Sequence, residues 1–185
     1  MDSQTALLLI DIQNDYFEGG ANPLAGSLEA SVNAGKVLQY FRKKNLSVVH
    51  VQHLSTRPGS TFFIPDTKGA EIHSNVQPED NEKVIIKHFP NSFRDTELLA
   101  FLQLKGVANL VVCGMMTHMC VDASVRAAKD MGFTCTLISD ACATKNLEIL
   151  GQKVLAKDVH NSFLAALNYF YANVVATSEF LAANS

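Results

Sequence analysis

The chain has 185 residues, of which 48% are hydrophobic and 18% are charged. This balance excludes a disordered chain, and the length is sufficient for one domain with a core that needs no disulfides or metals to fold. The net charge of −3 and the absence of a basic block argue against nucleic acid or an anionic membrane as the main partner. We therefore expect a single domain over residues 1–185.

The first residues, MDSQTALLLIDIQ, lack the features of an export signal, because they have no basic segment and Asp11 interrupts a short apolar run. No later stretch approaches the roughly 20 apolar residues of a membrane span. We expect a cytoplasmic protein with reduced thiols. The cysteines are Cys113, Cys120, Cys135 and Cys142, and they form no CxxC pair. The spacing therefore predicts neither a zinc ribbon nor disulfides.

Strand-like and helix-like segments alternate through the first half of the chain. The continuous apolar run at residues 6–11 predicts a strand buried on both faces. Residues 27–44 predict a helix with Ser27 at its N-cap, followed by a strand at 47–52. The expected apolar face of the helix comprises Val32, Val37, Leu38 and Phe41. The polar stretch 55–80, rich in proline and glycine, predicts an insertion loop.

The alternation continues in the second half. Further strands are predicted at 83–88, 109–114, 133–139 and 173–177, and helices at 93–106, 120–131 and 158–171, with a short turn or helix at 178–184. Repeated strand–helix units favour a parallel sheet covered on both faces. The predicted fold class is α/β, a doubly wound (Rossmann-like) three-layer sandwich around a mostly parallel sheet of about six strands.

Three reactive side chains follow or end strands of this predicted sheet. Asp11 ends the first strand, Lys87 ends the third, and Cys120 follows the fourth across a short loop. Ligands of doubly wound folds bind beyond the carboxyl ends of the strands, so we expect these residues to lie close together. A carboxylate can deprotonate a thiol, and a lysine can stabilise both anions.

Each of these residues also has a purely structural interpretation. A free cysteine is usually a small buried hydrophobe, which is our interpretation of Cys113 and Cys135. Cys120 differs because the start of a helix favours an anion, so we expect a lowered thiol pKa there. Asp11 alone could brace a loop, as we expect of nearby Asp15, and a lone lysine at a strand end usually extends to solvent.

Three stretches of the chain resemble motifs of a known family. LLLIDIQNDYF, VIIKHFPNSF and VVCGMMTHMCVDASVRAAKDMGF are similar to motifs of the isochorismatase-like cysteine hydrolases, also called nicotinamidase-related, and the resemblance covers about Ala6 to Thr177. By position, it implies Asp11 as the catalytic acid–base, Lys87 as its partner and Cys120 as the nucleophile. It also implies a cis peptide bond between Met115 and Met116, with the backbone N–H groups of Met116 and Cys120 forming an oxyanion hole.

The resemblance implies acyl transfer without a cofactor. Asp11 would take the thiol proton, Cys120 would attack an amide-type carbonyl, and water would then hydrolyse the thioester. Isochorismatase itself cleaves a vinyl ether and lacks this cysteine, so Cys120 favours hydrolysis of a C–N bond in a small molecule. Family members are commonly homodimers or homotetramers, which apolar residues such as Phe163, Phe170 and Tyr171 would allow.

We predict no metal site, although the chain has six histidines. Nicotinamidases of the family carry an Asp-x-His pair after the second strand, whereas His53 or Leu54 falls at the position of that aspartate here. His50 and His53 are three residues apart on a strand and should point to opposite faces. Without the metal, nicotinamide is a less suitable substrate.

Several residues on loops over the expected site are candidates for substrate binding. They are Gln13, Phe17, Phe62, Phe63, Phe93 and His118, although the aromatic residues could equally be plain core. His88 and His160 are expected to be structural. Two other functions remain open: a thiol redox sensor that uses Cys120, with Cys113 or Cys142 as resolving partner, and a catalytically silent oligomeric binding protein on the same fold.

Overall fold

The computed structural model describes residues 3–184 and contains one six-stranded sheet in the order β3-β2-β1-β4-β5-β8. Every neighbouring pair in this sheet is parallel. The strands of this sheet are β1 (Thr5–Ile10), β2 (Ser47–His53), β3 (Lys83–Lys87), β4 (Asn109–Met115), β5 (Thr134–Ala143) and β8 (Asn173–Val175). The helices are α1 (Ser27–Lys43), α2 (Leu98–Leu104), α3 (Asp122–Asp130), α4 (Ala156–Phe170) and α5 (Thr177–Ala183).

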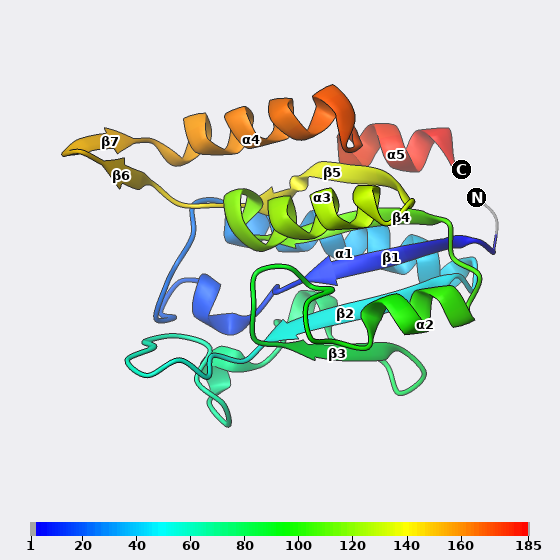
Figure 1. Cartoon of the computed structure of the whole chain (residues 1–185), viewed down its shortest axis with the longest axis horizontal. Coiled ribbons are helices and arrows are strands. Elements are labelled where there is room, and N and C mark those ends of the chain that lie inside the picture. Colours follow the sequence, from blue (N-terminus) through cyan, green and yellow to red (C-terminus); the bar gives the residue numbers. More distant parts are fainter. Residues whose placement is uncertain (1–2, 185) are drawn as a thin grey trace.

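Helices cover both faces of the sheet, which confirms the predicted doubly wound three-layer α/β fold (Figure 1). Residues of α1 and α5, such as Phe41 and Phe180, pack in the core on one face. Residues of α2, α3 and α4, such as Leu102, Val125 and Leu167, pack in the core on the other. Every residue of β1 is buried, as a central strand with helices on both sides requires.

Several local features differ from the sequence-based expectation, among them the second helix, which begins at Leu98 and not at residue 93. Val37, Leu38 and Phe41 of α1 are buried as expected, but Val32 is 45% exposed and Ala30 and Ala34 complete the buried face in its place. The N-cap is Gly26 rather than Ser27. The predicted helix at Cys120 begins earlier, as a π-helical turn at Thr117–Val121. A hairpin of β6 (Leu147–Ile149) and β7 (Gln152–Val154) precedes α4 and projects from the body of the molecule (Figure 1).

The insertion loop 55–80 is anchored to the first loop after β1. The carboxylate of Asp15 accepts hydrogen bonds from the backbone N–H of Phe63, at 2.6 Å, and of Ala21, at 3.1 Å. Gln13 and Ile72 form an isolated antiparallel bridge. Asp15 therefore braces the loops as expected, and the loop 55–80 is held over the carboxyl ends of the strands.

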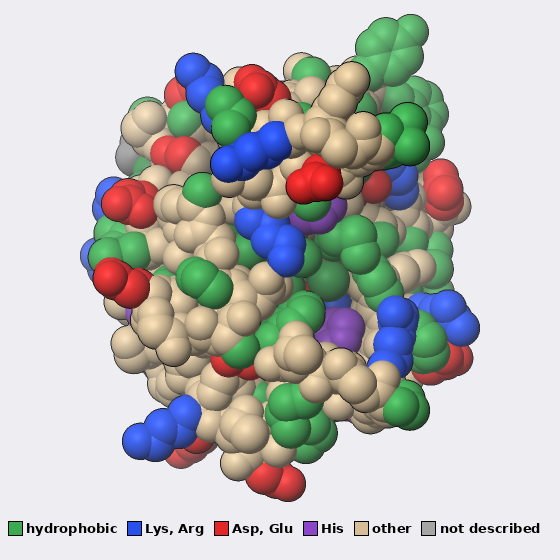
Figure 2. All heavy atoms as spheres, turned by 90° about the vertical axis from the view of Figure 1, so that its left-hand side faces the viewer, with side chains coloured by type: hydrophobic (Ala, Val, Ile, Leu, Met, Phe, Trp, Pro, Cys, Tyr) green, Lys and Arg blue, Asp and Glu red, His purple; other side chains and the backbone are tan. Residues whose placement is uncertain are grey.

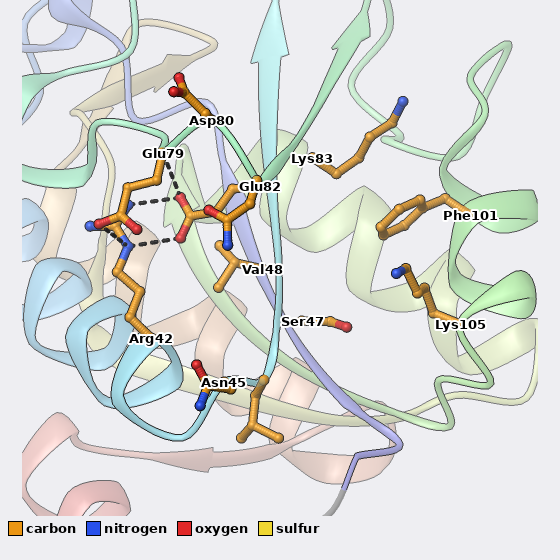
Figure 3. Close-up of a pocket in the computed structure, with 12 residues that line it drawn as sticks. Arg42, Asn45, Ser47, Val48, Glu79, Asp80, Glu82, Lys83, Phe101 and Lys105 are labelled. Atoms are coloured by element: carbon orange, nitrogen blue, oxygen red, sulfur yellow. Dashed lines mark hydrogen bonds and ion pairs between the residues drawn. The ribbon is translucent and has the colours of Figure 1, made fainter.

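At the opposite edge of the sheet, Glu82 joins α1, β2 and the end of the insertion loop (Figure 3). Its carboxylate accepts hydrogen bonds from Arg42 Nε and Nη2, both at 2.7 Å, and lies 2.8 Å from His50 Nε2. Burial opposes ionisation of Glu82, but the bonds from Arg42, Glu79 and His50 hold the pKa at about 2. Glu82 is thus the anion that the buried His50 and Arg42 share.

We expect Glu82→Gln to lower the free energy of unfolding at pH 7 by about 2 kcal/mol, because it leaves the largely buried guanidinium of Arg42 with only the exposed carboxylate of Glu79, 3.3 Å away. The pKa of Glu82 falls from its usual value of 4.5 to about 2 in the folded chain. Its contribution is therefore complete above pH 4.5 and is lost as the pH falls toward 2. Urea unfolding across this range should show the difference between wild type and variant shrinking. Glu79→Gln, at a side chain that is 58% exposed, is the matched control and should change little.

None of the helices in residues 3–184 is long and apolar enough to cross a membrane.

Candidate active site

Asp11, Lys87 and Cys120 meet at the carboxyl edge of the sheet. Asp11 follows β1 directly, Lys87 is the last residue of β3, and Cys120 lies in the π-helical turn after β4. The Lys87 ammonium is 2.7 Å from Asp11 Oδ2 and 3.3 Å from Cys120 Sγ. Asp11 and Lys87 are fully buried and Cys120 is 5% exposed. The strand order brings together residues that are far apart in the sequence.

Burial and mutual charge set the proton affinities of these groups. Burial raises the pKa of Asp11, and the neighbouring Lys87 ammonium offsets this only in part. Burial would lower the pKa of Lys87, but the charges of Asp11 and Cys120 outweigh it and raise that pKa. These shifts favour the charged form of Lys87 and make Asp11 a stronger base than an exposed carboxylate.

The expectation of a lowered thiol pKa at Cys120 is wrong. Burial and the charge of Asp11 raise the pKa of Cys120, and the ammonium of Lys87 offsets only part of this effect. The position at the start of a helix does not overcome the cost of placing a second anion beside Asp11. The raised pKa favours the neutral thiol of Cys120, and a carboxylate oxygen of Asp11 lies within 4.8 Å of its sulfur.

His53 is a member of the site that sequence reasoning considered only as a metal ligand. Its Nδ1 is 3.0 Å from the Lys87 ammonium and 4.0 Å from Asp11 Oδ2. Burial and the charge of Lys87 lower the pKa of His53 to about 3, so the ring is neutral. Because an ammonium can only donate, Nδ1 accepts and the ring proton lies on Nε2. The sequence signal was its place at the end of β2, where it pairs in register with Lys87.

The loop before Cys120 is held from several sides. Gly114 has φ of 149°, and a side chain there would overlap the backbone of Ile10. The peptide bond between Met115 and Met116 is cis. The buried Thr117 hydroxyl is 3.2 Å from the carbonyl oxygen of Ala143 and 2.9 Å from His160 Nδ1. His160 thus has a structural contact with this loop.

A cavity of about 170 Å³ opens above Cys120. Figure 2 looks onto this edge of the molecule and shows a hollow with a histidine side chain inside it. The lining includes Phe62, which was a candidate for substrate binding, and His88, which was expected to be structural. His88 also bonds through Nδ1 to the carbonyl oxygen of Leu54, at 2.7 Å.

The other candidates for substrate binding do not line this cavity. Gln13 is fully buried because its side-chain amide holds the backbone N–H and C=O of His53. Phe17 stacks on His73 with ring centroids 3.7 Å apart. Phe93 packs against Phe133 in the core, Phe63 is fully buried, and His118 Nδ1 bonds to the hydroxyl of Thr144. A position on a loop near the expected site does not tell whether a side chain lines the cavity or supports the loops around it.

The same cluster does not fit a resident metal ion. Asp11, His53 and Cys120 bring one ligand atom each to within 4.8 Å of one another. The Lys87 ammonium already lies among them, at 2.7 Å from Asp11, 3.0 Å from His53 and 3.3 Å from Cys120. A second cation at this point would meet direct repulsion from Lys87. The lysine therefore takes the place that a metal would need.

A larger hollow of about 430 Å³ lies at the amino ends of β2 and β3 (Figure 3). Its charged lining residues are largely paired, as Arg42 is with Glu82 and Lys83 is with Glu97. Its lining includes no cysteine or histidine. Of these two hollows, only the smaller one over Cys120 therefore has a thiol and imidazoles on its wall.

Comparisons with known proteins agree with this geometry. The isochorismatase domain profile matches residues 5–179. The isochorismatase family protein YddQ of Bacillus subtilis is 51% identical over 177 residues, covering 96% of this chain and 98% of its own. A crystal structure of an isochorismatase hydrolase from Oleispira antarctica superimposes with a TM-score of 0.94 at 46% identity, covering 98% of both chains. A streptothricin hydrolase of Streptomyces noursei is 33% identical, covering 88% of this chain and 56% of its own.

Proposed function

The chain belongs to the isochorismatase family, and on this premise we propose that it is a cysteine-dependent hydrolase of a small carboxamide or related C–N bond. One observation carries the proposal: a buried ammonium lies within hydrogen-bond distance of both a buried carboxylate and a buried thiol, beneath a small cavity. The relative named as a streptothricin hydrolase supports hydrolytic chemistry. The domain is proposed to span residues 1–185 and to act without a cofactor.

The proposed reaction starts from the neutral thiol. Asp11 takes the proton from Cys120 as the sulfur attacks the carbonyl carbon, and Lys87 stabilises the developing negative charge on sulfur. The backbone N–H groups of Met116 and Cys120 are the proposed donors to the oxyanion. Protonated Asp11 then gives its proton to the leaving nitrogen, and the C–N bond breaks to leave a thioester.

Hydrolysis of the thioester completes the proposed cycle. Asp11, again a carboxylate, takes a proton from a water molecule as the oxygen of that water attacks the thioester carbonyl. The C–S bond breaks, the carboxylic acid leaves, and the proton returns to sulfur. Release of ammonia from a panel of primary amides tests the proposal, and the decisive variants are those of Cys120 and Asp11.

The redox alternative has less support. Cys113 packs in the core on the opposite face of the sheet from Cys120, so it is not placed to resolve an oxidised Cys120. Cys142 packs in the same cluster as Cys120, but burial raises the pKa of its thiol, which disfavours the thiolate that a resolving cysteine needs. All four cysteines are free and buried. A sensing cysteine works as an exposed thiolate, whereas burial and Asp11 raise the pKa of Cys120.

We further propose that the chain forms a homodimer or homotetramer through α4 and the β6–β7 hairpin. Leu150 at the hairpin tip is 97% exposed, and Tyr169 and Phe170 at the end of α4 are 92% and 64% exposed. Hydrophobic side chains project at the top of the view in Figure 2, where Figure 1 places α4. Such a concentration of exposed apolar groups is typical of an interface. Light scattering during gel filtration measures the mass that decides this.

A further inference from the structure

Arg57 is a cation without a carboxylate partner at the mouth of the cavity. The chain has four arginines, and Arg42, Arg94 and Arg126 each lie within 4.0 Å of an acidic side chain. For Arg57, residues 3–184 provide no ion pair, and its exposed side chain lines the cavity above Cys120. Its carbonyl oxygen accepts bonds from the N–H and hydroxyl of Ser60, at 3.2 and 2.8 Å, which hold the turn that carries it.

The charge of Arg57 acts on the cavity and is not neutralised there. Together with burial, Lys87 and His88, it lowers the pKa of His53. Among the described residues, none that lines the cavity is an aspartate or glutamate. The carboxylate of Asp11 beneath the cavity is already paired with Lys87 at 2.7 Å. The mouth of the cavity therefore carries an uncompensated positive charge, which attracts an anionic ligand.

The rest of the lining limits what that ligand can be. His53 offers an N–H at Nε2 on the same cavity, and Phe62 and Met119 supply apolar walls. The volume of about 170 Å³ is well below the roughly 300–1,000 Å³ of sites for drug-sized ligands. A small ligand with a short carbon chain, and with a hydrogen-bond acceptor at the end farther from Cys120, would suit this shape.

We propose that the substrate is a small aliphatic carboxamide that also carries a carboxylate, and that the Arg57 guanidinium binds this carboxylate while Cys120 attacks the amide. This inference rests on the proposed hydrolase function and names the substrate class. Guanidinium and carboxylate form paired, charge-assisted hydrogen bonds, which few other surface groups offer. His53 Nε2–H is the second donor available to the bound acid.

The test compares succinamate with its uncharged counterpart succinamide, using ammonia release by the wild type and Arg57→Met. The wild type should prefer succinamate, and Arg57→Met should raise KM for succinamate about 10- to 100-fold with little change in kcat. The rate of ammonia release from succinamide should change little with the substitution. Lys105→Met is the charge-matched control, because Lys105 is exposed and follows α2 at the opposite edge of the sheet. Equal turnover of both amides, unchanged by Arg57→Met, would overturn the inference.

A binding measurement separates this inference from the proposed reaction. Succinate, the product acid, should bind to Cys120→Ala by calorimetry, and the affinity should fall at least tenfold when Arg57→Met is added. Binding of this kind without ammonia release from any amide by the wild type would keep the anion site and reject the hydrolase. Turnover of neutral amides with no binding of succinate would reject the anion site and keep the hydrolase.

Discussion

Replacing Cys120 by alanine is expected to lower kcat/KM for amide hydrolysis by about 10⁴- to 10⁶-fold, the loss typical of removing a catalytic nucleophile. The reason is that Cys120 is the one thiol among the described residues that line the cavity, and its sulfur lies 3.3 Å from the Lys87 ammonium. The hydroxyls of Ser55, Thr56 and Ser60 on the same cavity are weaker nucleophiles. Ammonia release under saturating and limiting amide measures both kcat and KM.

Cys135→Ala is the matched control for this experiment. Cys135 is also buried and free, and it belongs to the same hydrophobic cluster as Cys120, but it lies on β5 outside the cavity. Both substitutions remove one buried sulfur, so a loss of activity confined to Cys120→Ala cannot come from packing. Ammonia release by Cys120→Ala near the wild-type rate would contradict the assignment of the nucleophile.

Asp11→Asn is expected to reduce both activity and stability. Loss of the base should lower kcat by about 10²- to 10⁴-fold, because the thiol pKa of Cys120 is raised and its proton must be removed. The variant also leaves the fully buried Lys87 ammonium without its anion, which should cost about 3–5 kcal/mol of unfolding free energy. The backbone should be unaffected, because Asp11 has φ of 51° and asparagine tolerates this region.

The double variant Asp11→Asn with Lys87→Met separates the two effects. Removing both charges should restore much of the stability lost in Asp11→Asn, since no buried charge remains unpaired. It should restore none of the activity. Urea unfolding and ammonia release on the three proteins measure this, and recovery of activity along with stability would show that Asp11 acts only through folding.

The strands that carry the site could be predicted from the sequence because their signals are local. The run ALLLI before Asp11 and the run KVII before Lys87 are apolar enough to identify strands, and parallel strands end at one edge of a sheet. The β6–β7 hairpin escaped because its turn places Leu150 at φ of 51°, where glycine or asparagine is the usual signal. The position of Phe62 on the cavity could be predicted only as one candidate among several aromatic residues.

The parts of the site that escaped prediction depend on tertiary contacts. His53 joins the cluster because it pairs in register with Lys87 and because the Gln13 side chain forms hydrogen bonds with its backbone. Neither interaction can be seen in a single sequence. The raised pKa of Cys120 follows from the depth of burial beside Asp11, which helix position alone does not reveal. The side chain of Gln13 supports the backbone of His53 and does not line the cavity, so the expectation that Gln13 binds substrate has no support in the structure.

The most direct test of the proposed thioester is the mass of the peptide that contains Cys120, measured during turnover. Acid quenching of the wild type with succinamate, followed by peptide mass spectrometry, should show a succinyl group on the peptide that contains Cys120, while Cys120→Ala shows none. Turnover of succinamate with no acyl group on that peptide, at quench times from milliseconds to steady state, would contradict the thioester mechanism.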